Sequence, residues 1–242
     1  MGYYSYLVEH DFGLAPNPFG KYCTLAVCKP KIRKSNKLQI NDWVIGTGSK
    51  ALEDISRKKL RYHLIYVMQV SEIILMEDYW SDPRFEYKKP IINGPLATMY
   101  GDNFYHKDSS GNWIQEDSAH SLYDGKTNEE HLKTDTSGKN VLVAELFYYF
   151  GDKAPLIPKQ LQEICHTTLG EKKLSIEKGE KFDNMVQEYH SLKISEPLVT
   201  DKSIAFVLSM DLTMKGRPRE QMKEICVYDV KDGKIVSEQF HM

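Results

Sequence analysis

The 242-residue sequence lacks the run of roughly 20 apolar residues that a membrane-spanning helix needs. Its first residues, MGYYSYLVEHDFG, contain neither a basic segment nor an uninterrupted apolar stretch, so they do not form a secretory signal. An N-myristoylation motif after Gly2 requires Ser or Thr at position 6, where the chain has Tyr6. We therefore expect a soluble cytoplasmic protein with no membrane partner.

Cysteine is also scarce, and its four copies form no CxxC pair. Cys23 and Cys28 are five residues apart in an expected strand, and this odd spacing places them on opposite faces. That placement disfavours a metal ion shared by the two. We interpret all four residues, Cys23, Cys28, Cys165 and Cys226, as small buried hydrophobic side chains that stay reduced.

The histidines lack the spacings typical of metal sites. His106, His120 and His131, taken with Asp124 or Asp135, supply residue types that suit zinc, iron or manganese. No HxH, HxD or HExxH pattern occurs among them. We expect no bound metal and no cofactor.

The net charge of −2 conceals an asymmetry along the chain. Residues 21–61 carry eleven Lys and Arg against three acids, a local charge of +8, so the remainder carries −10. So basic a stretch attracts phosphates if it folds onto one face. Within it, Gly46–Lys50 lacks the spacing of a phosphate loop. The backbone N–H groups of this glycine turn, around Thr47 and Ser49, still suit one phosphate.

Apolar periodicity and turn residues predict a mixed α+β chain. Strands are predicted at residues 3–8, 24–28, 43–45, 64–70, 141–150, 203–212, 221–230 and 234–240, and a hairpin joins 103–106 to 113–115. Helices are predicted at 159–165 and 179–191. The Lys231-Asp232-Gly233 segment predicts a tight turn between the last two strands. We expect a β-rich N-terminal domain over 1–174 and a helix with an antiparallel sheet over 175–242.

Several short motifs follow one another along the chain: APNPFGKYCTLAVCKPKIRK and NDWVIGTGS within 12–49, YWxDxRFxxKKP at 79–90, GDN at 101–103, SxHS at 118–121 and FxYFG at 147–151. In this order they resemble the second type of nucleotide-modification-associated domain, found near DNA-modification systems of bacteria and phages. The resemblance covers about residues 1–170. It implies a DNA-modification or phage-defence setting and no particular reaction.

Asn41–Val44, the strand at 64–70 and the Tyr79–Lys88 element are similar to the PUA and EVE group of small β-barrels. That group holds a flipped base in an aromatic pocket, with polar groups for the base edge and cations for the backbone. The resemblance implies a barrel with such a pocket. The candidate ligand-binding residues, which are aromatic, basic or polar, are Asn17, Lys29, Arg33, Trp43, Thr47, Ser49, Tyr79, Trp80, Arg84, Phe85 and Lys88.

Residues 179–242, and MKEICVYDVKDGKIVSEQF above all, resemble the C-terminal half of SnoaL-like domains of the nuclear transport factor superfamily. The N-terminal helices and first strand of that fold are missing here. The resemblance therefore implies a sheet that covers the other domain or forms a homodimer, and no catalysis.

Three functions are open at this point. The first is a module that binds a modified base or nucleotide, free or in single-stranded or flipped nucleic acid. The second is a nucleotide- or base-processing enzyme with His120 as general acid or base, beside Ser121 and either Asp102 or Asp135. The third is a protein-interaction subunit. Convergence of the candidate aromatic residues in a basic concavity favours the first, and convergence of His120 with an acid in a cleft favours the second.

Overall fold

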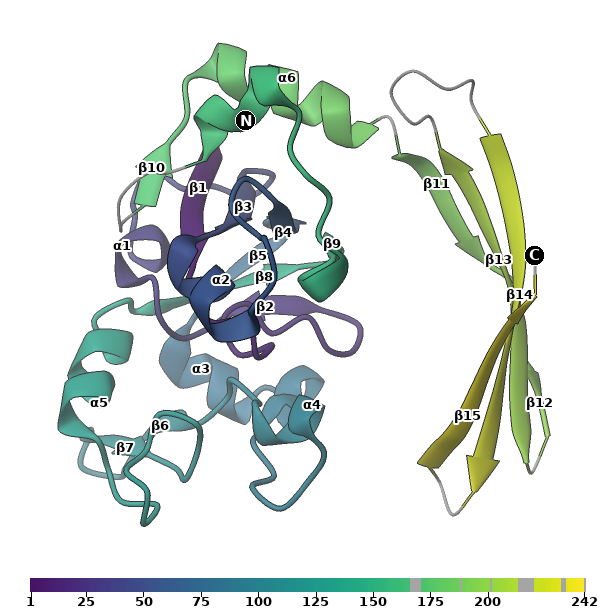
Figure 1. Cartoon of the computed structure of the whole chain (residues 1–242). Helices are drawn as coiled ribbons and strands as arrows, with labels where there is room; N and C mark the ends of the chain where they lie inside the picture. Colours follow the sequence, from purple (N-terminus) through teal and green to yellow (C-terminus); the bar gives the residue numbers. More distant parts are fainter. Residues whose placement is uncertain (166–170, 188, 201, 213–219, 232–233, 242) are drawn as a thin grey trace. The chain divides into compact units, whose positions relative to one another are not determined.

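The computed structural model describes residues 1–165, 171–187, 189–200, 202–212, 220–231 and 234–241. By its internal contacts the chain divides into two units, Met1–Gly179 and Glu180–Met242. Helices and strands are mixed along the chain, as Figure 1 shows, which confirms the predicted α+β class. Among the described helices, none is both long and apolar enough to cross a membrane.

The first unit contains a five-stranded sheet in the order β10-β1-β3-β4-β9. Its strands are β1 (Tyr3–Val8), β3 (Trp43–Gly48), β4 (Leu64–Gln69), β9 (Leu146–Tyr149) and β10 (Glu171–Lys173). β1 and β3 pair in parallel, and the other neighbours are antiparallel. The sheet is open, with β10 and β9 at its edges. The described strands therefore form no closed barrel, in contrast to the barrel that the PUA-like resemblance implied.

A second sheet, in the order β2-β8-β5, has three strands. These are β2 (Cys23–Leu25), β5 (Glu72–Leu75) and β8 (Asn140–Ala144). The single strand predicted at 141–150 is wrong, because the chain leaves this sheet after β8 and enters the five-stranded sheet as β9. Side chains alternate along β8, so Leu142 and Ala144 join one core cluster while Val141 and Val143 join the other.

The two clusters give the first unit three layers. One cluster lies between the two sheets, with Tyr4, Tyr6 and Met68 facing Leu25 and Leu142. The other packs the opposite face of the three-stranded sheet against shorter elements (Figure 1). These elements are α3 (Met76–Ser81), the 3-10 helix η1 (Pro83–Lys88), the hairpin β6 (Tyr105–Lys107) and β7 (Trp113–Gln115), and α5 (Glu129–Thr136). The predicted hairpin is confirmed by β6 and β7.

Short helices complete the first unit. They are α1 (Pro30–Arg33), α2 (Lys50–Ser56), α4 (Leu96–Met99), η2 (Gly151–Lys153) and η3 (Lys159–Ile164). The helix predicted at 159–165 is the 3-10 helix η3. The helix predicted at 179–191 is α6 (Ile176–Gln187), which begins in the first unit and ends in the second.

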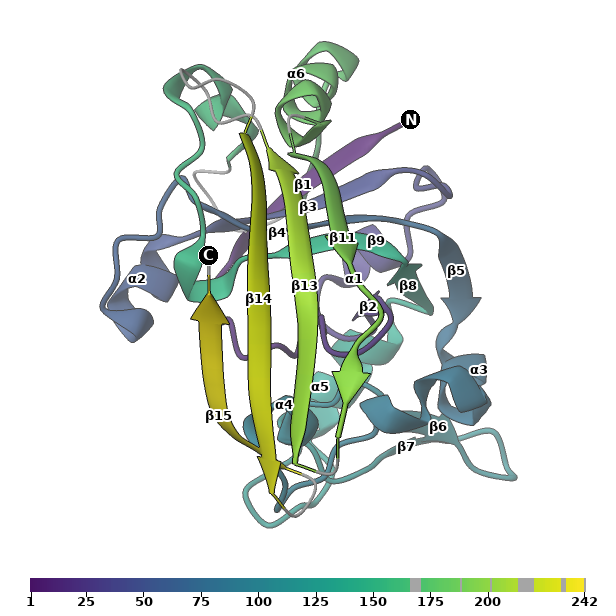
Figure 2. The same cartoon turned by 90° about the vertical axis from the view of Figure 1, so that its right-hand side faces the viewer.

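The second unit is an antiparallel sheet in the order β11-β13-β14-β15, with β12 paired to β13, and Figure 2 shows its long strands. The strands are β11 (Tyr189–Ile194), β12 (Leu198–Val199), β13 (Ser203–Leu212), β14 (Glu220–Lys231) and β15 (Lys234–His241). The last three agree with the predicted strands within one residue. β11 was missed because the predicted helix extended over its first residues. The predicted turn at Asp232-Gly233 lies outside the described residues.

Candidate functional site

Cys28 lies in a tight turn between β2 and α1. The backbone φ is 54° at Cys28 and 40° at Lys29, the left-handed region that residues other than glycine seldom adopt. Pro30 then begins α1 with the fixed φ that suits a first helical position. Such conformations concentrate at functional sites, where the surrounding structure holds them. The turn places the half-buried Cys28 side chain in the wall of a pocket.

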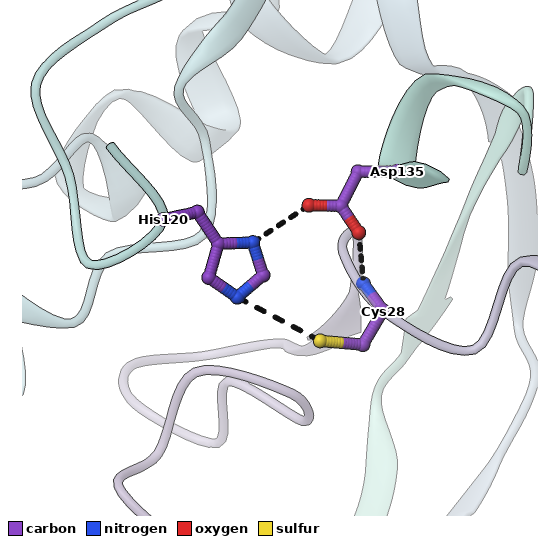
Figure 3. A group of neighbouring side chains, drawn as sticks. All are labelled: Cys28, His120 and Asp135. Carbon is purple, nitrogen blue, oxygen red and sulfur yellow. Dashed lines mark hydrogen bonds and ion pairs between the residues drawn. The ribbon is translucent and has the colours of Figure 1, made fainter. Parts of the chain in front are cut away.

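The Cys28 thiol, the His120 imidazole and the Asp135 carboxylate form a relay, shown in Figure 3. Cys28 Sγ lies 3.8 Å from His120 Nε2, and His120 Nδ1 lies 2.7 Å from Asp135 Oδ2. The other carboxylate oxygen, Oδ1, accepts a 2.7 Å hydrogen bond from the Cys28 backbone N–H. The carboxylate thus orients the imidazole and also fixes the turn that carries the thiol.

Burial and pairing set the charges of this relay. Burial by itself lowers the pKa of His120, but its bonds to Asp135 and Cys28 outweigh burial and raise the pKa to about 9. Burial by itself raises the pKa of Asp135, but the bond to His120, the positive charges of His120 and Arg33 and the Cys28 N–H together outweigh burial and keep the pKa below the usual range. Tyr105 donates a further 3.0 Å hydrogen bond to Asp135 Oδ2. At neutral pH His120 is therefore an imidazolium and Asp135 a carboxylate.

Arg33 joins the backbone segments that carry the relay. Its guanidinium donates to the carbonyl oxygens of Cys28 at 2.7 Å, Asp135 at 2.6 Å and Asn140 at 3.0 Å. The side chain is 1% exposed, and this burial lowers its pKa to about 10. A Cβ at Gly138 would lie 2.4 Å from the guanidinium carbon, so any larger residue there would displace the guanidinium. Arg33 therefore positions the relay and is not the surface phosphate ligand predicted from the basic stretch.

The relay opens into a pocket of about 690 Å³. Cys28, His120 and Asp135 line it together with residues from β1, the loop after β1, α5 and the segment after β7. This volume lies within the range of roughly 300–1,000 Å³ typical of small-molecule sites.

The same three groups also raise the question of a metal site, since their ligand atoms lie within 4.8 Å of one another. However, His120 turns Nε2 toward the thiol and Nδ1 toward the carboxylate. One imidazole nitrogen cannot then share an ion with both neighbours, and Asp135 Oδ1 is already bonded to a backbone N–H. The geometry is that of a proton relay.

Comparison with known proteins places this site in a family. Residues 1–203 match the family described as nucleotide modification associated domain 2. The chain belongs to that family. All three relay residues lie in the part that matches, so the site is part of the nucleotide modification associated domain.

Two other comparisons add less. A crystal structure of a protein from Mesorhizobium loti, described as a SnoaL-like polyketide cyclase, matches 32% of this chain and 68% of its own length, at 26% identity and a TM-score of 0.21. No curated protein matches the chain.

The predicted aromatic pocket does not come together in the domain. Tyr79 and Phe85 are 1% and 0% exposed and belong to the core cluster beneath α3, while Trp43 is buried in β3. Trp80 lies apart from them, stacked on His106 with 4.5 Å between ring centroids. The Tyr79 and Phe85 rings are covered by protein atoms, so a base has no access to either ring.

Lys88, Asp102, Asn17, Thr24 and Tyr79 form a closed polar cluster, the Lys88–Asp102 cluster. Lys88 Nζ donates to the Asn17 side-chain oxygen at 2.7 Å, and Asp102 accepts from Thr24 at 2.6 Å and from Tyr79 at 2.7 Å. All five residues are buried. Asp102, predicted as a catalytic acid, therefore has a structural environment, and Asp135 is the acid beside His120.

The other predicted polar ligands also have local roles. The buried Thr47 hydroxyl donates to a carbonyl of β1, and the Ser49 hydroxyl caps the N-terminus of α2. Arg84 pairs at the surface with Glu72 and Asp82. Of the eleven predicted ligand residues, all in the described part of the chain, only Lys29 lines the pocket.

Ser121 lines the pocket, but its hydroxyl serves its own turn. It donates to Asp117 at 2.9 Å or to the Ser118 carbonyl at 2.7 Å, and it accepts from the Ser118 N–H. The side chain that the structure places beside His120 Nε2 is instead Cys28, which was interpreted from the sequence as a buried hydrophobic residue. A cysteine 92 residues from its histidine leaves no local pattern, so only the fold reveals the pair.

Proposed function

We propose that the protein is a cysteine-dependent enzyme that removes or transfers an acyl group carried by a nucleobase or nucleotide. The observation that carries the proposal is the Cys28–His120–Asp135 relay in the wall of a pocket, because a nucleophile, a base and an orienting carboxylate are the parts of acyl-transfer catalysis. Membership of the nucleotide modification associated domain family supports a nucleotide as the carrier.

The chemistry follows from the protonation state of the relay. A protonated imidazole stabilises a neighbouring thiolate. The Cys28 sulfur attacks the carbonyl carbon, the C–N or C–O bond to the nucleotide breaks, and His120 gives its proton to the departing nitrogen or oxygen. Water, deprotonated by His120, then hydrolyses the thioester, which releases the carboxylic acid and restores the thiolate beside the protonated imidazole. An acceptor amine or alcohol in place of water makes the same steps a transfer.

The alternatives from sequence receive less support. The predicted base-binding pocket consisted of Trp43, Tyr79, Trp80 and Phe85. Three of these rings are buried, and Trp80 is stacked on His106 instead. A protein that only binds has no need of a thiol paired with an imidazolium. A homodimer through the C-terminal sheet stays a prediction, and it is compatible with the enzyme.

A panel of N-acylated and O-acylated deoxynucleoside 5′-monophosphates tests the proposal. We expect the wild-type protein to hydrolyse at least one, with an acyl adduct on Cys28 after rapid acid quench and mass spectrometry. Cys28→Ala removes the nucleophile and should reduce the rate by about 10³-fold or more, whereas Ser121→Ala should keep it. The proposal fails if no compound is hydrolysed and Cys28 is alkylated by iodoacetamide no faster than Cys165.

A further inference from the structure

Three aromatic rings form a stacked ladder in the wall of the relay's pocket. The His10 and Phe12 rings have centroids 6.0 Å apart at 29°, and the Phe12 and Tyr100 rings have centroids 5.2 Å apart at 15°. His10 and Phe12 belong to the loop after β1, and Tyr100 directly follows α4. All three line the pocket that Cys28 and His120 also line.

The ladder is exposed where a structural aromatic group would be covered. Phe12 is 47% exposed, whereas Tyr79 and Phe85 in the core are almost fully buried. Nothing in the core clusters requires Phe12, which neither cluster includes. A large exposed ring at the wall of a pocket is typical of a ligand-binding surface.

The charges of the pocket do not select a polyphosphate. Lys29 and His10 line it as bases, and Glu9 and Asp117 line it as acids. The Lys29 ammonium is also engaged, at 3.3 Å from the Leu7 carbonyl oxygen and 4.7 Å from the Tyr6 ring centroid. Selectivity for a nucleotide must then come mainly from its flat base.

We propose that the ladder of His10, Phe12 and Tyr100 is the platform on which the substrate's base stacks. The ligand class is a nucleoside or nucleoside monophosphate, whose base enters the pocket and whose acyl group reaches Cys28. Stacking accepts any base, because every base has a π-face, so the platform sets the class of ligand and not the base. This inference rests on the proposed function for the reaction and adds the binding site of the base.

Calorimetric titration with the four deoxynucleoside 5′-monophosphates tests the platform without turnover, since these probes carry no acyl group. 2-Deoxyribose 5-phosphate, which lacks the base, is the matched ligand control. We expect Phe12→Ala to weaken nucleotide binding about ten- to a hundredfold and to leave binding of this base-free probe unchanged. Phe12→Tyr keeps a flat ring and should restore the affinity. Tyr62→Ala, at an exposed ring of 42% outside the pocket lining, should have no effect.

The platform is overturned if Phe12→Ala binds nucleotides as wild type does, if the base-free probe binds as tightly as the nucleotides, or if no nucleotide binds. Iodoacetamide alkylation of Cys28, measured on the same proteins, separates this failure from failure of the enzyme. Loss of the platform leaves the Cys28 reactivity unchanged. Nucleotide binding that requires Phe12, with an unreactive Cys28, would retain the platform and remove the acyl-transfer proposal.

Discussion

The Lys88–Asp102 cluster and the Cys28–His120–Asp135 relay are two buried polar groups of one unit that differ in what they face. In the cluster, Lys88 makes three hydrogen bonds to oxygen atoms and both Asp102 oxygens accept one, and neither residue lines the pocket. The relay uses the same kinds of buried charge but ends on a thiol in the pocket wall. Closed pairing indicates a structural role, and a chain of partners that ends at a cavity indicates chemistry.

The largest expected difference is between two cysteines, Cys28 in the relay and Cys23 in the core. Cys28→Ser should reduce acyl hydrolysis about 10³-fold or more with little change in melting temperature, because the half-buried side chain leaves the core intact. Cys23→Ser should do the reverse, since Cys23 is 0% exposed and a buried hydroxyl without a partner costs roughly 1–3 kcal/mol. Rates and thermal unfolding of both variants check the pair. Equal effects of the two substitutions on the rate would contradict the functional role of Cys28 and the structural role of Cys23.

Lys88→Met should affect stability and not the reaction. It leaves the three oxygen atoms that accept from Lys88 without their buried donor, and a buried polar group left without its partner costs roughly 1–3 kcal/mol. Urea unfolding measures the loss, with the exposed Lys31→Met as control. A selective loss of activity in a fully folded Lys88→Met protein would place the cluster in the functional site.

Asp135→Asn should move the pH profile of the reaction. In the wild type the rate should fall as pH rises through about 9, because His120 then loses the proton that it gives to the leaving group. Asp135 raises this pKa, so its replacement should shift the alkaline limb to lower pH. Profiles of kcat/KM between pH 6 and 10, a window set around that pKa, check this. An alkaline limb at the same pH in both proteins would show that the pKa of His120 does not set it.

Patterns that depend on nearby residues were predictable. Runs of aromatic and β-branched residues between turn signals identified β1 with the bounds that the structure has, and the long strands β13 to β15 within one residue. The family was identified from short motifs in the same part of the chain, and the match extends to residue 203.

Patterns that depend on distant contacts were not predictable. Arg33 was counted with the basic stretch, but carbonyl oxygens from residues 28, 135 and 140 enclose it. Tyr79 and Phe85 have the side chains of a base pocket, and only packing shows that they face the core. Cys28 pairs with His120 across 92 residues of sequence, so no local spacing marks it.

The alkylation rate of Cys28 by iodoacetamide at pH 7 tests the central claim most directly, with peptide mass spectrometry to assign the site. Because His120 is the cation beside the sulfur, we predict that Cys28 reacts fastest of the four cysteines and that His120→Gln slows it by about tenfold or more. A Cys28 that reacts at the same rate with and without His120 would contradict the relay, and with it the proposed enzyme.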